Sequence, residues 1–121
     1  MMMPELNDTP SIIDVPGGKV IAEHVGRIAT GTDAMSVAHM KAPAGWSEPA
    51  QRPQFDEVTL VIAGTVLVEH DGGTTTVTAG QSVVTAAGER VRYSTGADGA
   101  EYVAICTPAF APDTVNREDE G

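Results

Sequence analysis

The feature that most constrains this chain is a series of short segments rich in Val, Thr, Ile and Tyr, separated by glycine-containing turns. These residue types favour strands, and glycine accepts the positive φ that tight turns need. No stretch shows the 3.6-residue apolar period of an amphipathic helix. Several short strands at this spacing predict an all-β fold, either a sandwich or a barrel.

The expected strands are short and regularly spaced. They cover residues 19–25, 34–41, 56–63, 65–70, 74–78, 82–85, 90–94 and 101–106, with a further extended piece at 11–15. The sequence Asp71-Gly72-Gly73 predicts a tight hairpin. The segment 96–99 predicts another turn, because it holds two glycines and an aspartate.

The length of 121 residues fits one domain with a single core, and a hydrophobic content of 41% favours a folded chain. Proline and glycine separate three segments along the sequence. We expect an N-terminal arm at 1–18, a folded body at 19–107 and a C-terminal tail at 108–121, whose last residues we expect to be disordered. The arm could add a strand to a neighbouring molecule.

The charge balance limits the classes of partner. Seven Lys and Arg stand against seventeen Asp and Glu, a net charge of −10. Such a charge argues against nucleic acid and against an anionic membrane surface. The first ten residues lack the pattern of a signal peptide, and no apolar run could span a bilayer, so we expect a cytoplasmic protein without a membrane partner. The single cysteine, Cys106, excludes an internal disulfide.

Five residues form a pattern that carries a family signal. Gly45, Glu57 and Gly64 are followed by Gly80 and Gly88. Their order and spacing resemble the two signature motifs of the cupin superfamily. The resemblance covers roughly residues 34–107. It implies an all-β, single-domain cupin jelly-roll β-barrel built from two sheets.

The metal ligands of that family are largely absent. The first two histidine positions of the family fall on Gln51 and Pro53, or on Gln54 if the register shifts by one, and the third falls on Val91. Only Glu57 keeps the residue type of a family ligand. One carboxylate with neutral amides suits a transition metal poorly. We therefore predict no metal ligands and no cofactor, while a divalent metal stays an open alternative.

Within the superfamily, the chain resembles the small ethanolamine-utilisation-type cupins. Their histidine positions are also degenerate, and residues 106–117 are similar to the tail of that group. This resemblance names no reaction and does not imply ethanolamine metabolism.

Two residues are candidates for catalysis. Strand alternation places Glu57 on one face with Thr59 and Val61, and an inward carboxylate would have a raised pKa suited to acid–base chemistry. Tyr93 shares a face with Val91, so its phenol could face Glu57. The alternatives are a solvated carboxylate at the rim and a core aromatic residue with a satisfied hydroxyl.

Four residues are candidates for ligand binding. Gln51 and Gln54 lie on the loop that leads into the strand of Glu57, although a solvated loop is the alternative. Trp46, the single tryptophan, could line a pocket or pack structurally. His39 lies shortly before Gly45 and could face either side of its strand.

The resemblance and these residues together suggest a small-molecule-binding cupin that holds a polar or carbohydrate-like ligand. The alternative is a metal-dependent cupin enzyme of the dioxygenase, isomerase or decarboxylase type, which would use Glu57 with non-standard ligands. A third interpretation is an interaction module whose barrel is filled by side chains. We expect a homodimer, because small barrels leave sheet edges and apolar strands to cover.

Overall fold

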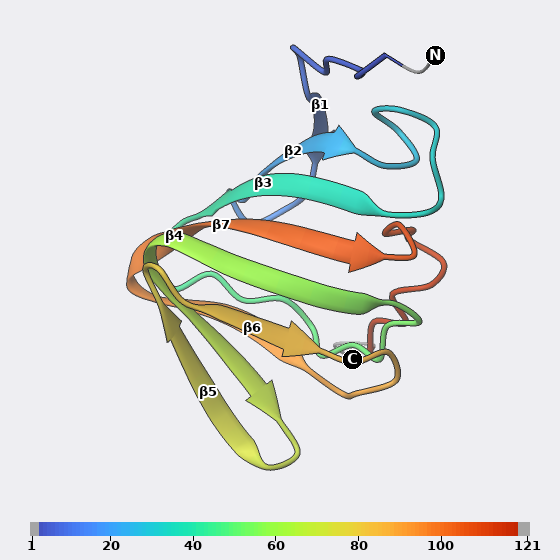
Figure 1. Cartoon of the computed structure of the whole chain (residues 1–121). Helices are drawn as coiled ribbons and strands as arrows, with labels where there is room; N and C mark the ends of the chain where they lie inside the picture. Colours follow the sequence, from blue (N-terminus) through green and yellow to red (C-terminus); the bar gives the residue numbers. More distant parts are fainter. Residues whose placement is uncertain (1–2, 119–121) are drawn as a thin grey trace.

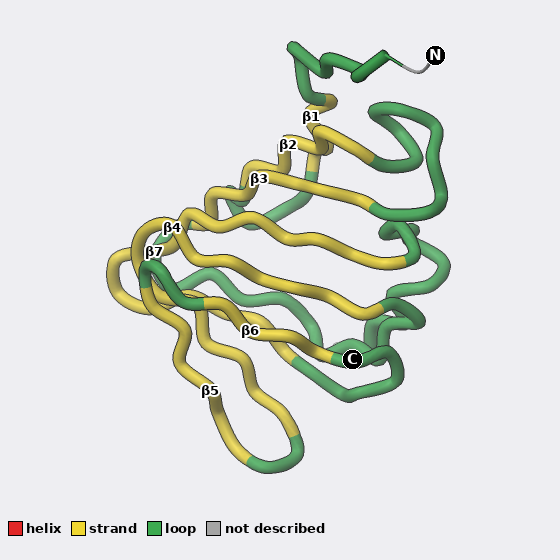
Figure 2. The backbone as a smooth tube through the Cα atoms, in the orientation of Figure 1, coloured by secondary structure: helices red, strands yellow, loops and turns green. Residues whose placement is uncertain are grey.

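The computed structural model describes residues 3–118, and every regular element in that range is a strand (Figures 1 and 2). The strands are β1 (Ser11–Asp14), β2 (Val20–Val25), β3 (Ser36–Ala42), β4 (Asp56–His70), β5 (Gly73–Thr78), β6 (Ser82–Thr85) and β7 (Arg92–Thr107). The all-β prediction is confirmed. In residues 3–118 no helix has the length and hydropathy needed to cross a bilayer.

All seven strands belong to one antiparallel sheet rather than to the two sheets that we expected. Its order is β1-β2-β3-β7-β4-β5, and β6 pairs with the first part of β4. Strands β4 and β7 pair along most of their length, and both bend sharply. The bend carries the sheet from one layer of the barrel to the other, so hydrogen bonds join the two layers (Figure 1).

The bend lies at Gly64 on β4 and at residues 96–99 on β7. Pairing shifts there, because Gly64 faces Ala100 whereas Val66 faces Thr95. Gly64 has φ +76, and a Cβ on it would lie 2.1 Å from the carbonyl oxygen of Gly99. The predicted break between 63 and 65, and the predicted turn at 96–99, are therefore bends within two continuous strands. The reason is that glycine permits a bulge as readily as a turn.

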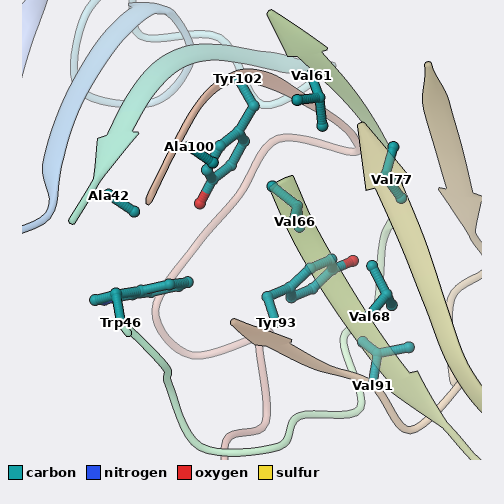
Figure 3. Packing of buried hydrophobic residues seen from close by; sticks show 10 residues of the cluster. All are labelled: Ala42, Trp46, Val61, Val66, Val68, Val77, Val91, Tyr93, Ala100 and Tyr102. Atoms are coloured by element: carbon teal, nitrogen blue, oxygen red, sulfur yellow. The ribbon is translucent and has the colours of Figure 1, made fainter. Parts of the chain in front are cut away.

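The main core lies between the layers and is shown in Figure 3. Alternation along β4 buries Val61, Val66 and Val68, each 1% exposed. Val91 and Tyr93 are buried on the facing part of the barrel. After the bend, Val66 and Val68 are two positions apart, as are Val91 and Tyr93, which is the spacing of a half-buried strand.

The terminal segments belong to the barrel. Strand β1 pairs with β2 of the same chain, so the arm adds its strand internally rather than to a neighbour. The described part of the tail folds back along the loop at 50–54, and the Phe110 ring packs edge-on against Phe55 with 5.8 Å between centroids. The disorder predicted for the last residues falls on 119–121, which lie outside the described residues.

A row of apolar side chains crosses the outer face of the sheet. Register places five residues side by side on adjacent strands: Val84, Val58, Ile105, Val37 and Val25. Val84 is 66% exposed at one end of this row, and Leu60, 43% exposed, lies beside it. We call these five residues the outer row.

Candidate functional site

The inside of the barrel holds a cavity of about 560 Å³. Its walls come from strands β1, β2, β3, β4 and β7, from the segment between β1 and β2, from the loop before β4 and from the C-terminal segment. The volume lies in the range of small-molecule sites, about 300–1,000 Å³. The interpretation of the protein as a module with a filled barrel therefore loses its main support.

Glu57 lies on the wall of this cavity, near the start of β4. Thr59 and Val61, the next residues on the same face, are each 1% exposed, which confirms the predicted alternation. The Thr59 hydroxyl donates a hydrogen bond of 3.4 Å to Glu57 Oε2. The carboxyl group is thus directed inward rather than toward the outer solvent.

The surroundings of Glu57 favour its protonated form. Burial raises the pKa of Glu57 to about 7, and the negative charge of Glu48 adds to the rise. The charge of Lys19 and the hydrogen bond from Thr59 act in the opposite direction but are smaller in effect. A carboxyl group with a pKa near neutrality can both donate and accept a proton.

Gln51 also lines the cavity, and its side chain is 3% exposed. Its backbone pairs with Val91 on one side and with Arg117 on the other. The Arg117 guanidinium donates to the Gln51 side-chain oxygen at 3.5 Å and to Glu48 Oε2 at 3.3 Å. The C-terminal segment therefore fixes the polar side of the cavity.

Two tyrosines line the cavity with their hydroxyls in different directions (Figure 3). The Tyr93 hydroxyl lies 3.0 Å from the Thr85 hydroxyl and points toward Val68 and Val77. Tyr93 therefore contributes its ring to the wall, while its phenol is occupied by Thr85. The Tyr102 hydroxyl points instead toward the side where Trp46 lies. Burial raises the pKa of both phenols, so both stay protonated.

Trp46 is buried in the core at 7% exposure and is not among the residues that line the cavity. Its ring supports a residue that does line it, because the Lys19 Nζ lies 4.2 Å from the Trp46 centroid. The prediction that Trp46 lines the pocket is therefore wrong: Trp46 lies outside the lining and packs against Lys19, which belongs to it.

Two predicted binding residues lie outside the cavity. His39 Nε2 is 2.6 Å from Glu101 Oε2, and neither residue lines the cavity. His39 alternates with the buried Ala38, so it faces away from the barrel interior. Gln54 has an exposed side chain, and its backbone N–H binds the Thr114 carbonyl oxygen. We expected His39 and Gln54 to contact a ligand in the cavity, but neither residue lines it.

The positions that bind metal in the family do not fit a transition-metal ion here. Gln51 accepts a hydrogen bond from Arg117, Val91 is apolar and Pro53 offers no side-chain donor. Glu57 alone supplies a ligand atom of the usual kind, and transition metals prefer nitrogen and sulfur donors. Among residues 3–118 no group of three His, Cys, Asp or Glu residues could hold a metal.

Cys106 lies on the same wall as Glu57, directly across the β4–β7 pairing. Burial and the nearby charge of Glu57 raise the pKa of its thiol. A thiol of this kind stays protonated and is a poor nucleophile. Its surroundings therefore indicate an inert residue.

Sequence reasoning missed most polar residues of the cavity, and four of these bear on its chemistry: Lys19, Glu48, Tyr102 and Arg117. Tyr102 could have been predicted from the sequence, because it lies four residues before Cys106 on a predicted strand and therefore on the same face. The others come from a strand end, a loop and the tail, where no period indicates the direction of a side chain.

No protein-family model matches the chain. A curated relative, endoribonuclease YbeY of Myxococcus xanthus (strain DK1622), is 45% identical over 102 residues. The match covers 84% of this chain and 35% of that protein. The chain thus spans about a third of the length of the curated relative that it matches.

Solved structures of similar shape share the barrel. An oxalate decarboxylase variant from Bacillus subtilis has a TM-score of 0.77 and 15% identity, covering 92% of this chain and 31% of that one. KdgF from Halomonas sp. has a TM-score of 0.70 and 16% identity, covering 85% and 89%. EutQ from Clostridium difficile has a TM-score of 0.61 and 17% identity, covering 76% and 65%.

These similarities, together with the all-β architecture, show a single-domain cupin barrel, and the predicted fold class is confirmed. The chain therefore has a cupin-type fold. At these identities the solved structures define its fold and not its substrate.

Proposed function

We propose that this cupin-type protein binds a small polar molecule in its barrel, where Glu57 donates or accepts a proton. The observation that carries the proposal is a cavity of about 560 Å³ with an inward carboxyl group on its wall. A pKa of about 7 lets Glu57 change its charge near neutrality. Gln51 and the ring of Tyr93 lie on the same cavity and would contact the ligand.

Within the superfamily, we place the chain beside the ethanolamine-utilisation-type cupins. The degenerate histidine positions at Gln51, Pro53 and Val91 support this placement, and the fold of EutQ is compatible with it. Ribonuclease activity, the activity named for the Myxococcus xanthus relative, is not part of the proposal. A net charge of −10 would repel RNA phosphates.

Thermal-shift screening against small polar metabolites tests the proposal. At least one compound should raise the melting temperature of the wild type, and Glu57→Gln should weaken its binding by about tenfold or more, the usual cost of losing a charged hydrogen bond. Glu69→Gln is the matched control, because Glu69 is on the same strand but exposed and paired with Arg92. Stabilisation by no compound, or equal binding by Glu57→Gln, would contradict the proposal.

Elemental analysis after dialysis without chelator tests the metal-dependent alternative. We expect less than stoichiometric Mn, Fe, Ni or Zn in the untagged protein, because the donors at Gln51 and Val91 are unsuitable. About one equivalent of any of these metals per chain would instead favour an enzyme with a non-standard metal site.

We also propose a homodimer that covers the outer row. An apolar row across five strands, with Val84 66% exposed, is a surface that a second copy could bury by face-to-face packing.

A further inference from the structure

Lys19, directly before β2, brings a positive charge into the cavity. Its ammonium lies 4.2 Å from the ring centroid of Trp46 and 5.4 Å from that of Tyr102. Aromatic faces at these distances attract a cation and hold it in place. Gly17 precedes it with φ +87 and packs so close to the indole that an added Cβ would lie 3.3 Å from Trp46 Cδ1. The contacts with the two rings show that the Lys19 side chain points inward.

Lys19 and Tyr102 together present donors that residues 3–118 leave without an acceptor. No hydrogen bond or salt bridge within that range involves the Lys19 ammonium or the Tyr102 hydroxyl. No fully buried side-chain nitrogen or oxygen in the range lacks a partner, so these two atoms are open to the cavity. Donors in a largely desolvated space bind best to an acceptor supplied by a ligand.

The charges around Lys19 decide which ligand fits. Glu48 already pairs with Arg117 at 3.3 Å, and the buried Glu23 accepts hydrogen bonds from the backbone of Ile28 and Ala29. Glu57 is the remaining inner carboxyl group; burial raises its pKa to about 7, and the charge of Lys19 acts against this rise. The two other acidic residues of the lining, Asp14 and Asp113, are exposed to solvent at the rim. Among residues 3–118, the Lys19 ammonium is thus the charged group inside the cavity that has no hydrogen-bonded or ion-paired partner.

We propose that the ligand is a small organic monocarboxylate, with its carboxylate held between the Lys19 ammonium and the Tyr102 hydroxyl. The proposal rests on the small-molecule-binding function above and names its ligand class. A charge-assisted bond to Lys19 is stronger than a neutral one. A cationic ligand would meet Lys19 as a like charge. The other cation of the lining, Arg117, is already paired with Glu48, so a dianion would find one unpaired cation.

Isothermal titration with matched probes tests the ligand class. Glucuronate, glucose and glucosamine differ mainly in carrying an anionic, a neutral or a cationic group, as do benzoate, benzyl alcohol and benzylamine. Inorganic phosphate tests whether any small anion suffices. For at least one series, the wild type should bind the carboxylate about tenfold or more tightly than the neutral member.

The variants test the two donors separately. Lys19→Met should abolish the preference for the carboxylate, Lys19→Arg should restore most of it, and Tyr102→Phe should weaken carboxylate binding about fivefold. Lys41→Met is the matched control, because Lys41 is the other lysine of the chain and is exposed on β3. It should bind as the wild type does. Cooperative thermal unfolding checks that each variant is folded, and Tyr102→Phe tests the site even if Lys19→Met fails to fold.

The outcomes separate this proposal from the function on which it rests. Equal or tighter binding of the neutral or cationic probes, tighter binding of phosphate, or a carboxylate preference that survives in folded Lys19→Met would overturn the ligand class. The proposed function would still stand if any compound bound in a Glu57-dependent way. Binding of none of the probes would overturn the ligand class, and an empty metabolite screen would overturn both.

Discussion

Gly64 offers the sharpest test of how the barrel is built, because its replacement combines two separable costs. Its φ of +76 lies in the left-handed region, where an L side chain is strained. A Cβ at this position would also lie 2.1 Å from the Gly99 carbonyl oxygen and 2.9 Å from the Ala100 Cα. Both neighbours are backbone atoms of the paired strand, so no side-chain rotation can relieve the contact.

The expected loss for Gly64→Ala follows from these two terms. The left-handed conformation costs about 1–2 kcal/mol for a residue with a Cβ. Forcing a methyl group into a packed contact costs about 1–3 kcal/mol more. The free energy of unfolding should therefore fall by about 2–5 kcal/mol. For a domain of this size, that loss lowers the melting temperature by roughly 10 °C or more.

Gly88→Ala is the matched control. Gly88 has φ +88, but an added Cβ would meet no atom within 4 Å. It should cost only the conformational term, about 1–2 kcal/mol. Urea unfolding of both variants and the wild type, followed by tryptophan fluorescence, measures the difference. Equal losses for the two variants would refute the view that close approach of β4 and β7 at the bend fixes glycine at position 64.

Three further predictions concern other parts of the barrel. Burial raises the pKa of Glu57 from 4.5 to about 7, so the folded protein binds this proton more tightly than the unfolded chain, and stability should fall as pH rises through this window. Urea titrations across it should show a loss of up to about 3 kcal/mol that Glu57→Gln lacks. Phe110→Ala should lower stability by about 2–3 kcal/mol in thermal unfolding, because it removes the edge contact with Phe55. Val84→Lys should convert a dimer to a monomer in light scattering, with stability changed by less than about 0.5 kcal/mol.

Each of these has a clear contrary result. An unchanged pH profile in Glu57→Gln would place the carboxyl group in solvent. If Phe110→Ala lowers stability no more than a substitution of an exposed residue does, the tail is not part of the core. A wild type that is already monomeric, or a Val84→Lys variant that stays dimeric, would remove the outer row from the interface.

Much of the barrel could be predicted because alternation is a local signal. Spacing alone predicts that Glu57, Thr59 and Val61 share one face and that Val91 and Tyr93 share another, while the resemblance to the cupin motifs implies that these faces point inward. What alternation cannot give is the identity of neighbours across the barrel. The Tyr93 phenol bonds to Thr85, eight residues earlier, and this pairing depends on how the layers meet.

The cavity residues outside the regular strands were harder to predict than those on the strands. Lys19 and Arg117 come from segments that composition assigned to the arm boundary and to the tail, and neither segment has a hydrophobic period. Arg117 reaches the site because the tail's backbone pairs with the loop at 50–54. Such pairing is set by tertiary packing, which a sequence pattern does not encode. His39 shows the reverse case, in which a chemically attractive residue lies on the outer face.

The return of the tail to the barrel has a practical consequence for shortened or tagged forms of this protein. A truncation to residues 19–107, the boundaries that composition suggests, would keep Glu57 and Tyr93 but remove Arg117, Phe110 and β1. The remaining barrel would have an open side, and Gln51 would lose its backbone partner from the tail. A purification tag or fused domain joined to the tail would follow a segment that lies against that same wall, since the Glu118 backbone N–H binds the Ala50 carbonyl oxygen. Ligand measurements therefore require the full chain, with any tag cleaved before the titration.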